Sequence, residues 1–140
     1  MQVIEYRRAL HRIPELDRDL PETLAYLRSV LEPLGCALFS PIPGALCAFF
    51  DFGKADAIAF RSDADALPIQ EQTGLPFAST HPGKMHACGH DGHMSMVLDL
   101  AVWLDSQNDL NHNALLIFQP AEETTGGAKD LCQSGVFEQY

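Results

Sequence analysis

Two short runs of the sequence contain only apolar residues, and each leads directly into carboxylates. Ala57-Ile58-Ala59-Phe60 precedes an acidic segment from Arg61 to Pro68, and Ala114 to Phe118 precedes Gln119-Pro120-Ala121-Glu122-Glu123. Such runs predict strands buried on both faces, which is typical of sheets covered by helices. Open α/β sheets build their sites at the carboxyl ends of their strands. The chain is therefore constrained to a layered fold with polar residues at one edge.

Helical patterns surround these strands. Apolar spacing and capping signals predict helices at Met1 to Ile13, Pro21 to Leu34, Asp91 to Ser106 and Gly126 to Phe137, the last with Gly135 as its stop signal. Two more strands are predicted at Cys36 to Phe39 and Ala45 to Phe52, and a loop over residues 69–87. This alternation indicates an α/β fold, a three-layer α/β/α arrangement with a mostly parallel or mixed sheet. About four strands that all look central would leave sheet edges uncovered.

Composition narrows the class of protein. The chain has 140 residues, enough for one domain with a real core, and a formal net charge of -10. The acidic balance argues against a nucleic-acid surface, and no window is apolar enough to span a membrane. The arginine-rich start lacks the apolar region of a secretory signal peptide. Four scattered cysteines indicate reduced thiols, so we expect a cytoplasmic protein.

The stretch from His86 to His93 holds the densest set of metal-binding residue types. Cys88 and His90 are separated by one glycine and can reach a single ion such as zinc. A structural cysteine beside a surface histidine would explain this pair about as well. The neighbouring His86, Asp91 and His93 favour the metal interpretation, because a metal-binding imidazole usually also needs a carboxylate partner for its other ring nitrogen. Asp91 also begins the predicted helix, where a carboxylate is stabilised without any metal.

Two acidic pairs follow the apolar strands. Glu122 and Glu123 are adjacent, and buried neighbouring carboxylates repel unless something neutralises one of them. A metal would do so, with one glutamate as ligand and the other as general base. A solvated strand end is the alternative. Asp63 and Asp65 lie two residues apart on an extended segment, so their side chains point the same way.

At this point the residues resemble a known family. His86-Ala87-Cys88-Gly89-His90-Asp91-Gly92-His93 and Phe118-Gln119-Pro120-Ala121-Glu122-Glu123 resemble signature stretches of the two-metal aminoacylase and carboxypeptidase family of metallohydrolases. The branch with N-acyl amino acid amidohydrolases, hippurate hydrolases and auxin-conjugate hydrolases is the most similar. His11 to Leu16, Arg61 to Pro68 and Gly126 to Lys129 also resemble that group, so the likeness covers nearly the whole chain.

The resemblance implies a zinc-exopeptidase-like fold and a centre of two divalent ions, with Zn, Mn, Co or Ni varying by member. It implies that Cys88, His90 and Glu123 are metal ligands and that Glu122 is the general base for a metal-activated water. Asp63 and Asp65 would support the site, together with the site neighbours Asp91, His86 and His93. The implied reaction is hydrolysis of an N-acyl amino acid, or a similar peptide-like amide, to a carboxylic acid and an amino acid.

The departures from the family are also informative. Family members are longer and contain a lid or dimerisation domain, and two further histidine ligands come from positions beyond Tyr140. None of His11, His81 or His112 matches those positions, and His11 is interpreted as a cap or packing residue. Residues 1–140 are thus expected to be the N-terminal part of a truncated catalytic domain, with little activity. The alternatives are a non-catalytic fragment that self-associates as a homo-oligomer, or a partial site for one metal.

Overall fold

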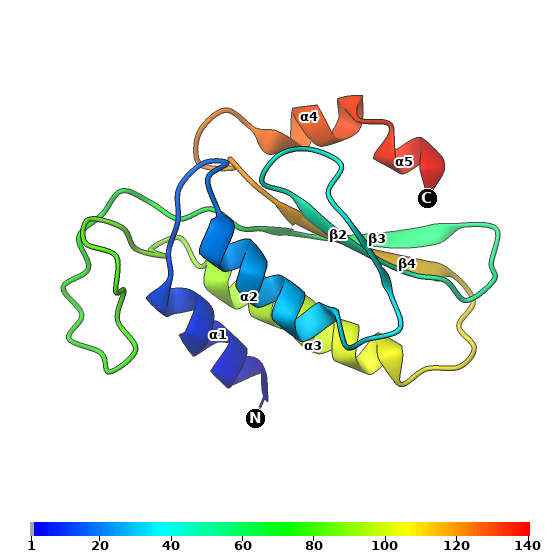
Figure 1. The fold of residues 1–140 in the computed structure, drawn as a ribbon, viewed down its shortest axis with the longest axis horizontal. Coiled ribbons are helices and arrows are strands. Elements are labelled where there is room, and N and C mark those ends of the chain that lie inside the picture. Colours follow the sequence, from blue (N-terminus) through cyan, green and yellow to red (C-terminus); the bar gives the residue numbers. More distant parts are fainter. Residues whose placement is uncertain (1) are drawn as a thin grey trace.

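The computed structural model describes residues 2–140, with helices on both faces of a four-stranded sheet (Figure 1). The strands are β1 (Ala37–Phe39), β2 (Leu46–Phe50), β3 (Ala57–Asp63) and β4 (Asn113–Gln119). One face carries α1 (Gln2–Arg12), α2 (Pro21–Leu31) and α3 (His90–Asp105), and the other carries α4 (Gly127–Gln133) and α5 (Val136–Gln139). The predicted three-layer α/β/α arrangement is confirmed.

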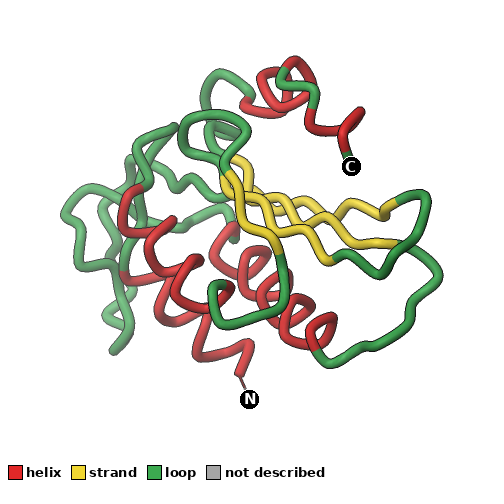
Figure 2. The backbone as a smooth tube through the Cα atoms, turned by 45° about the vertical axis from the view of Figure 1, so that its right-hand side comes forward, coloured by secondary structure: helices red, strands yellow, loops and turns green. Residues whose placement is uncertain are grey.

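The sheet is mixed, with strand order β1-β2-β4-β3. The pairs β1–β2 and β2–β4 are antiparallel, whereas β3 and β4 run parallel, from Ala57 opposite Asn113 to Asp63 opposite Gln119. Figure 2 shows the strands side by side in one sheet. Because β3 and β4 share a direction, their carboxyl ends meet at the same edge of the sheet. The acidic segments that follow them are thereby brought together.

The central strand β4 is buried at every position. Its alternate side chains point to opposite faces, as the pleat of a strand requires. Leu116 and Phe118 pack into the larger core with Leu98 of α3, while Leu115 and Ile117 pack under α4 and α5. The prediction of a strand covered on both faces is correct for this run.

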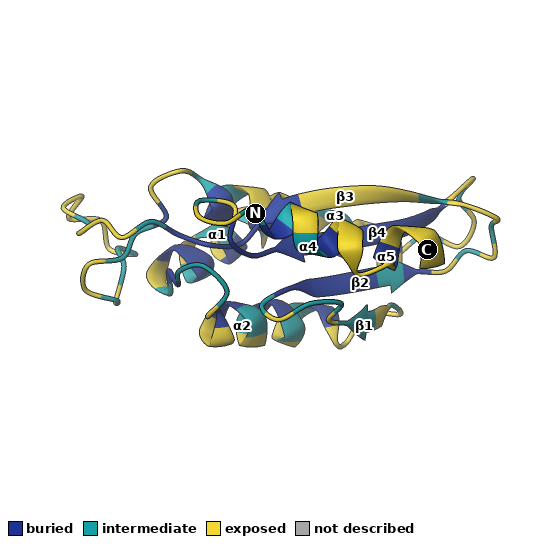
Figure 3. Ribbon diagram, turned by 90° about the horizontal axis from the view of Figure 1, so that it is seen from above, coloured by how far each residue is buried: buried dark blue, intermediate teal, exposed yellow. Residues whose placement is uncertain are grey.

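The same prediction was wrong for β3. Ile58 and Phe60 are 47% and 40% exposed, and Figure 3 shows the strand exposed along most of its length while β4 is buried. The physical reason is that β3 pairs only with β4 among the described residues, which makes it an edge strand. Its regular part also runs three residues further than expected, to Asp63.

Other boundaries shifted for local reasons. Helix α2 ends at Leu31 rather than Leu34, because Pro33 has no N–H to continue the helix. The predicted final helix is divided into α4 and α5 at Gly135, which has a φ of 78°. Residues 69–87 form a loop, as predicted, whereas Met1 lies outside the described residues. No helix in the described chain is both long and apolar enough to cross a bilayer.

Candidate metal centre

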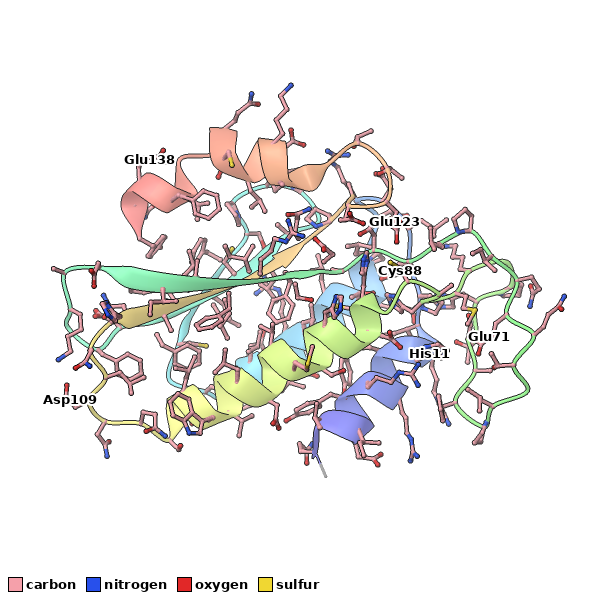
Figure 4. All side chains as sticks on the ribbon, turned by 180° about the vertical axis from the view of Figure 1, so that it is seen from behind. His11, Glu71, Cys88, Asp109, Glu123 and Glu138 are labelled. Atoms are coloured by element: carbon pink, nitrogen blue, oxygen red, sulfur yellow. The ribbon has the colours of Figure 1, made fainter. Side chains whose placement is uncertain are left out.

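The three predicted ligands lie together at the carboxyl edge of the sheet. Cys88 is in the turn before α3, His90 is the first residue of α3, and Glu123 follows β4. One possible ligand atom from each lies within 4.8 Å of those from the other two. Figure 4 shows Cys88 and Glu123 at one end of the molecule, with Asp109 and Glu138 at the other.

His90 is oriented by the backbone of Asp65. Its Nδ1 lies 2.7 Å from the Asp65 carbonyl oxygen, which can only accept, so Nδ1 is the donor. The other ring nitrogen, Nε2, lies 3.7 Å from a Glu122 oxygen and 3.8 Å from a Glu123 oxygen. Hydrogen bonding with Asp65 raises the pKa of His90 from 6.5 to about 9, against the opposing effect of burial. Metal-ligating histidines typically have such a fixed Nδ1 hydrogen bond.

The side chain of Asp65 holds the two glutamates in place. It is fully buried and accepts from the backbone N–H groups of Glu122 at 3.1 Å and Glu123 at 3.0 Å, one on each carboxylate oxygen. Burial alone would raise the pKa of this carboxyl, but hydrogen bonds from His90, Glu123 and Glu122 outweigh it and lower the pKa. Asp65 therefore connects the ends of β3, β4 and the start of α3.

The turn that carries the glutamates is strained. Ala121 has a φ of 58°, which a residue with a Cβ rarely adopts, and its carbonyl accepts from the N–H of Gly126 at 2.8 Å. A Cβ on Gly127 would lie 2.1 Å from the carbonyl oxygen of Pro120, so only glycine fits there. This tight turn aims Glu122 and Glu123 towards α3.

Negative charge is concentrated around Cys88. The neighbouring Glu123 carboxylate has the largest effect and raises the pKa of the Cys88 thiol, and slight burial and the charges of Glu122 and Asp63 raise it further. Without a counter-charge the thiol therefore keeps its proton more strongly than an ordinary cysteine. A divalent cation would reverse this preference, because it stabilises the thiolate directly.

These residues fit a divalent cation. A thiol, an imidazole and a carboxylate converge, and they are the donor types that zinc and similar ions use. Oε1 of Glu123 is buried and has no hydrogen-bond partner among the described residues. A buried carboxylate oxygen without a donor is costly, and a metal ion would satisfy it.

The residues predicted to support the site differ in burial and in their contacts. Asp63 is buried, with one oxygen 2.8 Å from Arg61, and its charge acts on both Cys88 and His90. His86 is buried, but neither ring nitrogen has a hydrogen-bond partner in residues 2–140, and burial lowers its pKa from 6.5 to about 4. His93 is exposed, with its ring centroid 6.0 Å from that of His90.

Asp91 has a larger role than helix capping. Its Oδ1 accepts from the N–H of Gly92, while its Oδ2 lies 2.9 Å from Nε of Arg7 and 2.6 Å from Nδ1 of His11. The sequence alone predicts a cap or packing role for His11 and gives no signal for Glu71, whereas both ring nitrogens of His11 lie beside carboxylates. No local pattern identifies this cluster, because its three residues come from positions 11, 71 and 91.

Comparisons with known proteins agree with this geometry. The model of peptidase family M20/M25/M40 matches residues 59–140. An uncharacterized hydrolase of Staphylococcus epidermidis is 42% identical over 96% of the chain, and an N-acetyldiaminopimelate deacetylase of Streptococcus uberis is 44% identical over all of it. The chain belongs to peptidase family M20/M25/M40.

A solved structure extends the comparison to three dimensions. The Bacillus subtilis YXEP protein, described as a dinuclear metal binding peptidase from the M20 family, is 40% identical over 96% of the chain, with a TM-score of 0.90. The chain spans 36% of the length of the staphylococcal hydrolase and 38% of the deacetylase and of the YXEP protein.

Proposed function

We propose that this chain contributes Cys88, His90 and Glu123 as ligands to a centre of two divalent metal ions in an amidohydrolase. The convergence of these three donors within 4.8 Å is the observation that carries the proposal. The name of the YXEP protein supports the number of ions, since it is described as dinuclear. The candidate ions are Zn, Mn, Co and Ni.

The two adjacent glutamates suit different roles. The Glu123 side chain is 20% exposed and has the unpartnered oxygen, which favours it as the ligand. The Glu122 side chain is 41% exposed, which favours contact with water and substrate. We therefore assign Glu122 as the general base.

The proposed reaction is amide hydrolysis. Bound cations would supply activation of a water molecule and polarisation of the amide carbonyl. The Glu122 carboxylate accepts a proton from the attacking water as the C–O bond forms, and returns it to the nitrogen as the C–N bond breaks. Asp65 keeps the Glu122 and Glu123 backbones fixed during these steps. The products are a carboxylic acid and an amine.

N-acyl amino acids are the proposed substrate class. The deacetylase relative is named for a substrate of this kind, an N-acetylated diamino acid. Calorimetric titration with Zn²⁺ and an assay of amine release from N-acetyl amino acids test the proposal. We expect weak metal binding and little turnover from the 140 residues, because three protein ligands do not complete a two-metal centre. Absence of any metal binding, or rapid turnover without metal, would contradict it.

The exposed strand β3 favours a second candidate function, which is self-association without catalysis. Its outer backbone edge is unpaired in the described part of the chain, and Ile58, Phe60 and Trp103 are exposed nearby. Unpaired strand edges with apolar side chains readily pair with other chains. Sedimentation velocity over a concentration series tests this candidate, and a monomer at every concentration would exclude it.

A further inference from the structure

We propose that His11 is a positioning residue for the metal centre, because its buried side chain bridges Asp91 and Glu71. This inference rests on the metal centre proposed above. His11 belongs to the last turn of α1, and its side chain is only 2% exposed. Figure 4 shows His11 and Glu71 at the same end of the molecule as Cys88 and Glu123.

Both nitrogens of the His11 ring face carboxylates. Nδ1 lies 2.6 Å from Oδ2 of Asp91, and Nε2 lies 3.2 Å from Oε1 of Glu71. The ring therefore bridges two acidic side chains that come from different segments of the chain. Glu71 is held in its ionised form: burial opposes ionisation, but hydrogen bonds from Ser79, Thr73 and His11 lower its pKa.

Basic side chains surround the two carboxylates of this cluster. Arg7 Nε lies 2.9 Å from the same Asp91 oxygen that His11 contacts. The carboxylate side chains of Asp91 and Glu71 are 1% and 3% exposed, respectively. Buried carboxylates that lose their partners are strongly destabilising, so loss of the His11 ring would leave Glu71 and part of Asp91 without their contacts.

Each carboxylate holds a different segment. Asp91 directly follows the proposed ligand His90, and its Oδ1 accepts from the N–H of Gly92 in the first turn of α3. Glu71 accepts from the N–H of Ser79 at 2.6 Å and from the hydroxyl of Thr73, so it closes the outer part of the 69–87 loop. His11 thus joins this loop to the start of α3.

The proposed ligands Cys88 and His90 lie between two anchors. On the loop side, Met85 forms two backbone hydrogen bonds of 3.0 Å with Leu67. On the helix side, Asp91 is fixed by His11 and Arg7. Residues 86–90 span these anchors, so a change at His11 moves the helix-side anchor. Removal of a residue that orients a metal ligand commonly lowers the metal affinity about 10- to 100-fold.

Cobalt binding gives a direct test. We expect His11→Gln to lower the Co²⁺ affinity of the 140-residue chain about tenfold or more and to weaken the thiolate-to-cobalt absorption band. The double variant His11→Gln with Glu71→Gln also removes the Glu71 carboxylate that lost its imidazole partner, and is expected to recover thermal stability and part of the affinity. His112→Gln is the matched control, because His112 also lies 2.7 Å from a carboxylate, Asp56, but is exposed and away from the site.

A core variant separates positioning from general destabilisation. Leu31→Ala lowers stability in α2, away from the site, and is expected to leave the Co²⁺ affinity and the absorption band of the folded protein unchanged. If the wild-type chain binds Co²⁺ and His11→Gln binds it with the same affinity, this inference alone is overturned. Failure of the wild-type chain to bind Co²⁺ would overturn the metal centre and this inference with it.

Discussion

The backbone N–H of Glu123 donates to the Asp65 carboxylate at 3.0 Å, across 58 positions of the sequence. The second oxygen of Asp65 accepts from Glu122, and its carbonyl accepts from His90. A single buried residue therefore fixes the glutamate pair and one proposed ligand. The two N–H donors bind separate oxygens of this carboxylate.

Asp65→Asn should damage both folding and metal binding. An asparagine offers one oxygen, and its amide group would face an N–H donor, which leaves a buried donor unsatisfied. We expect the free energy of unfolding to fall by about 1–3 kcal/mol. We also expect the Zn²⁺ affinity to fall about tenfold or more. Urea denaturation and calorimetry measure the two. Asp51→Asn is the control, because exposed Asp51 accepts from Gly53 alone; equal effects of the two substitutions would disprove the role of Asp65.

Substitution of Glu122 and of Glu123 should have different effects on metal binding. Glu123→Gln removes the charge of the proposed ligand and is expected to weaken Zn²⁺ binding about tenfold or more, whereas Glu122→Gln should change it only slightly. Isothermal titration calorimetry of both variants under identical conditions makes the comparison. If Glu122→Gln were the more damaging of the two, the roles assigned to these residues would have to be exchanged.

Three of the four cysteines should react with iodoacetamide in a definite order. Cys132 is exposed and should be alkylated readily, while burial raises the pKa of Cys47 to about 12 and protects it. Cys88 is exposed but should react more slowly than Cys132, because Glu123 raises the pKa of its thiol. Mass spectrometry over time measures each site.

Two changes should affect Cys88 alone. Zn²⁺ is expected to block its alkylation, since a coordinated thiolate is shielded. Glu123→Gln is expected to speed it in metal-free protein, because the thiol pKa moves back towards its usual value. Cys132 provides the internal control in every sample, and equal effects at Cys132 would show that the reagent, rather than the site, had changed.

His86 should make the fold sensitive to mild acid. Its pKa is lowered from 6.5 to about 4, so protons bind the unfolded chain before they bind the folded one. The stability present above pH 6.5 is therefore lost as the pH falls towards 4. Between pH 7 and pH 5, wild type should lose about 2 kcal/mol more than His86→Leu, which cannot titrate.

The leucine variant suits this test because His86 makes no hydrogen bond with any of the described residues, so none is lost. Urea denaturation at half-unit pH steps gives the two curves. Parallel curves for wild type and His86→Leu would rule out His86 as the source of acid sensitivity. His112→Leu controls for the loss of an exposed histidine.

The self-association candidate makes its own prediction. Ile58→Lys places a charge on the exposed strand β3 and should lower the sedimentation coefficient at high protein concentration, if the wild type associates through this edge. The free energy of unfolding should change by no more than about 0.5 kcal/mol, as for other surface substitutions. Ile69→Lys is the matched control, because Ile69 is 44% exposed but lies in the loop. An equal effect at Ile69 would point to a surface other than β3.

Much of the candidate site could be predicted because its chemistry is local. Cys88 and His90 are one residue apart, and the glutamates are adjacent, so any fold that forms the turn and the strand end keeps each pair together. Their convergence within 4.8 Å required the parallel pairing of β3 with β4 and the position of α3. The His11–Glu71 contact joins side chains 60 positions apart and had no sequence signal.

The sequence by itself determined the layered α/β class, the buried strand β4 and the donor types of the site, because periodicity and side-chain chemistry are properties of short segments. Only the tertiary structure decided that β3 is an exposed edge, that Asp65 holds both glutamates, and that His11 is clamped between two buried carboxylates. These features depend on which elements become neighbours. That choice depends on strand order and packing across the whole chain rather than on any one segment.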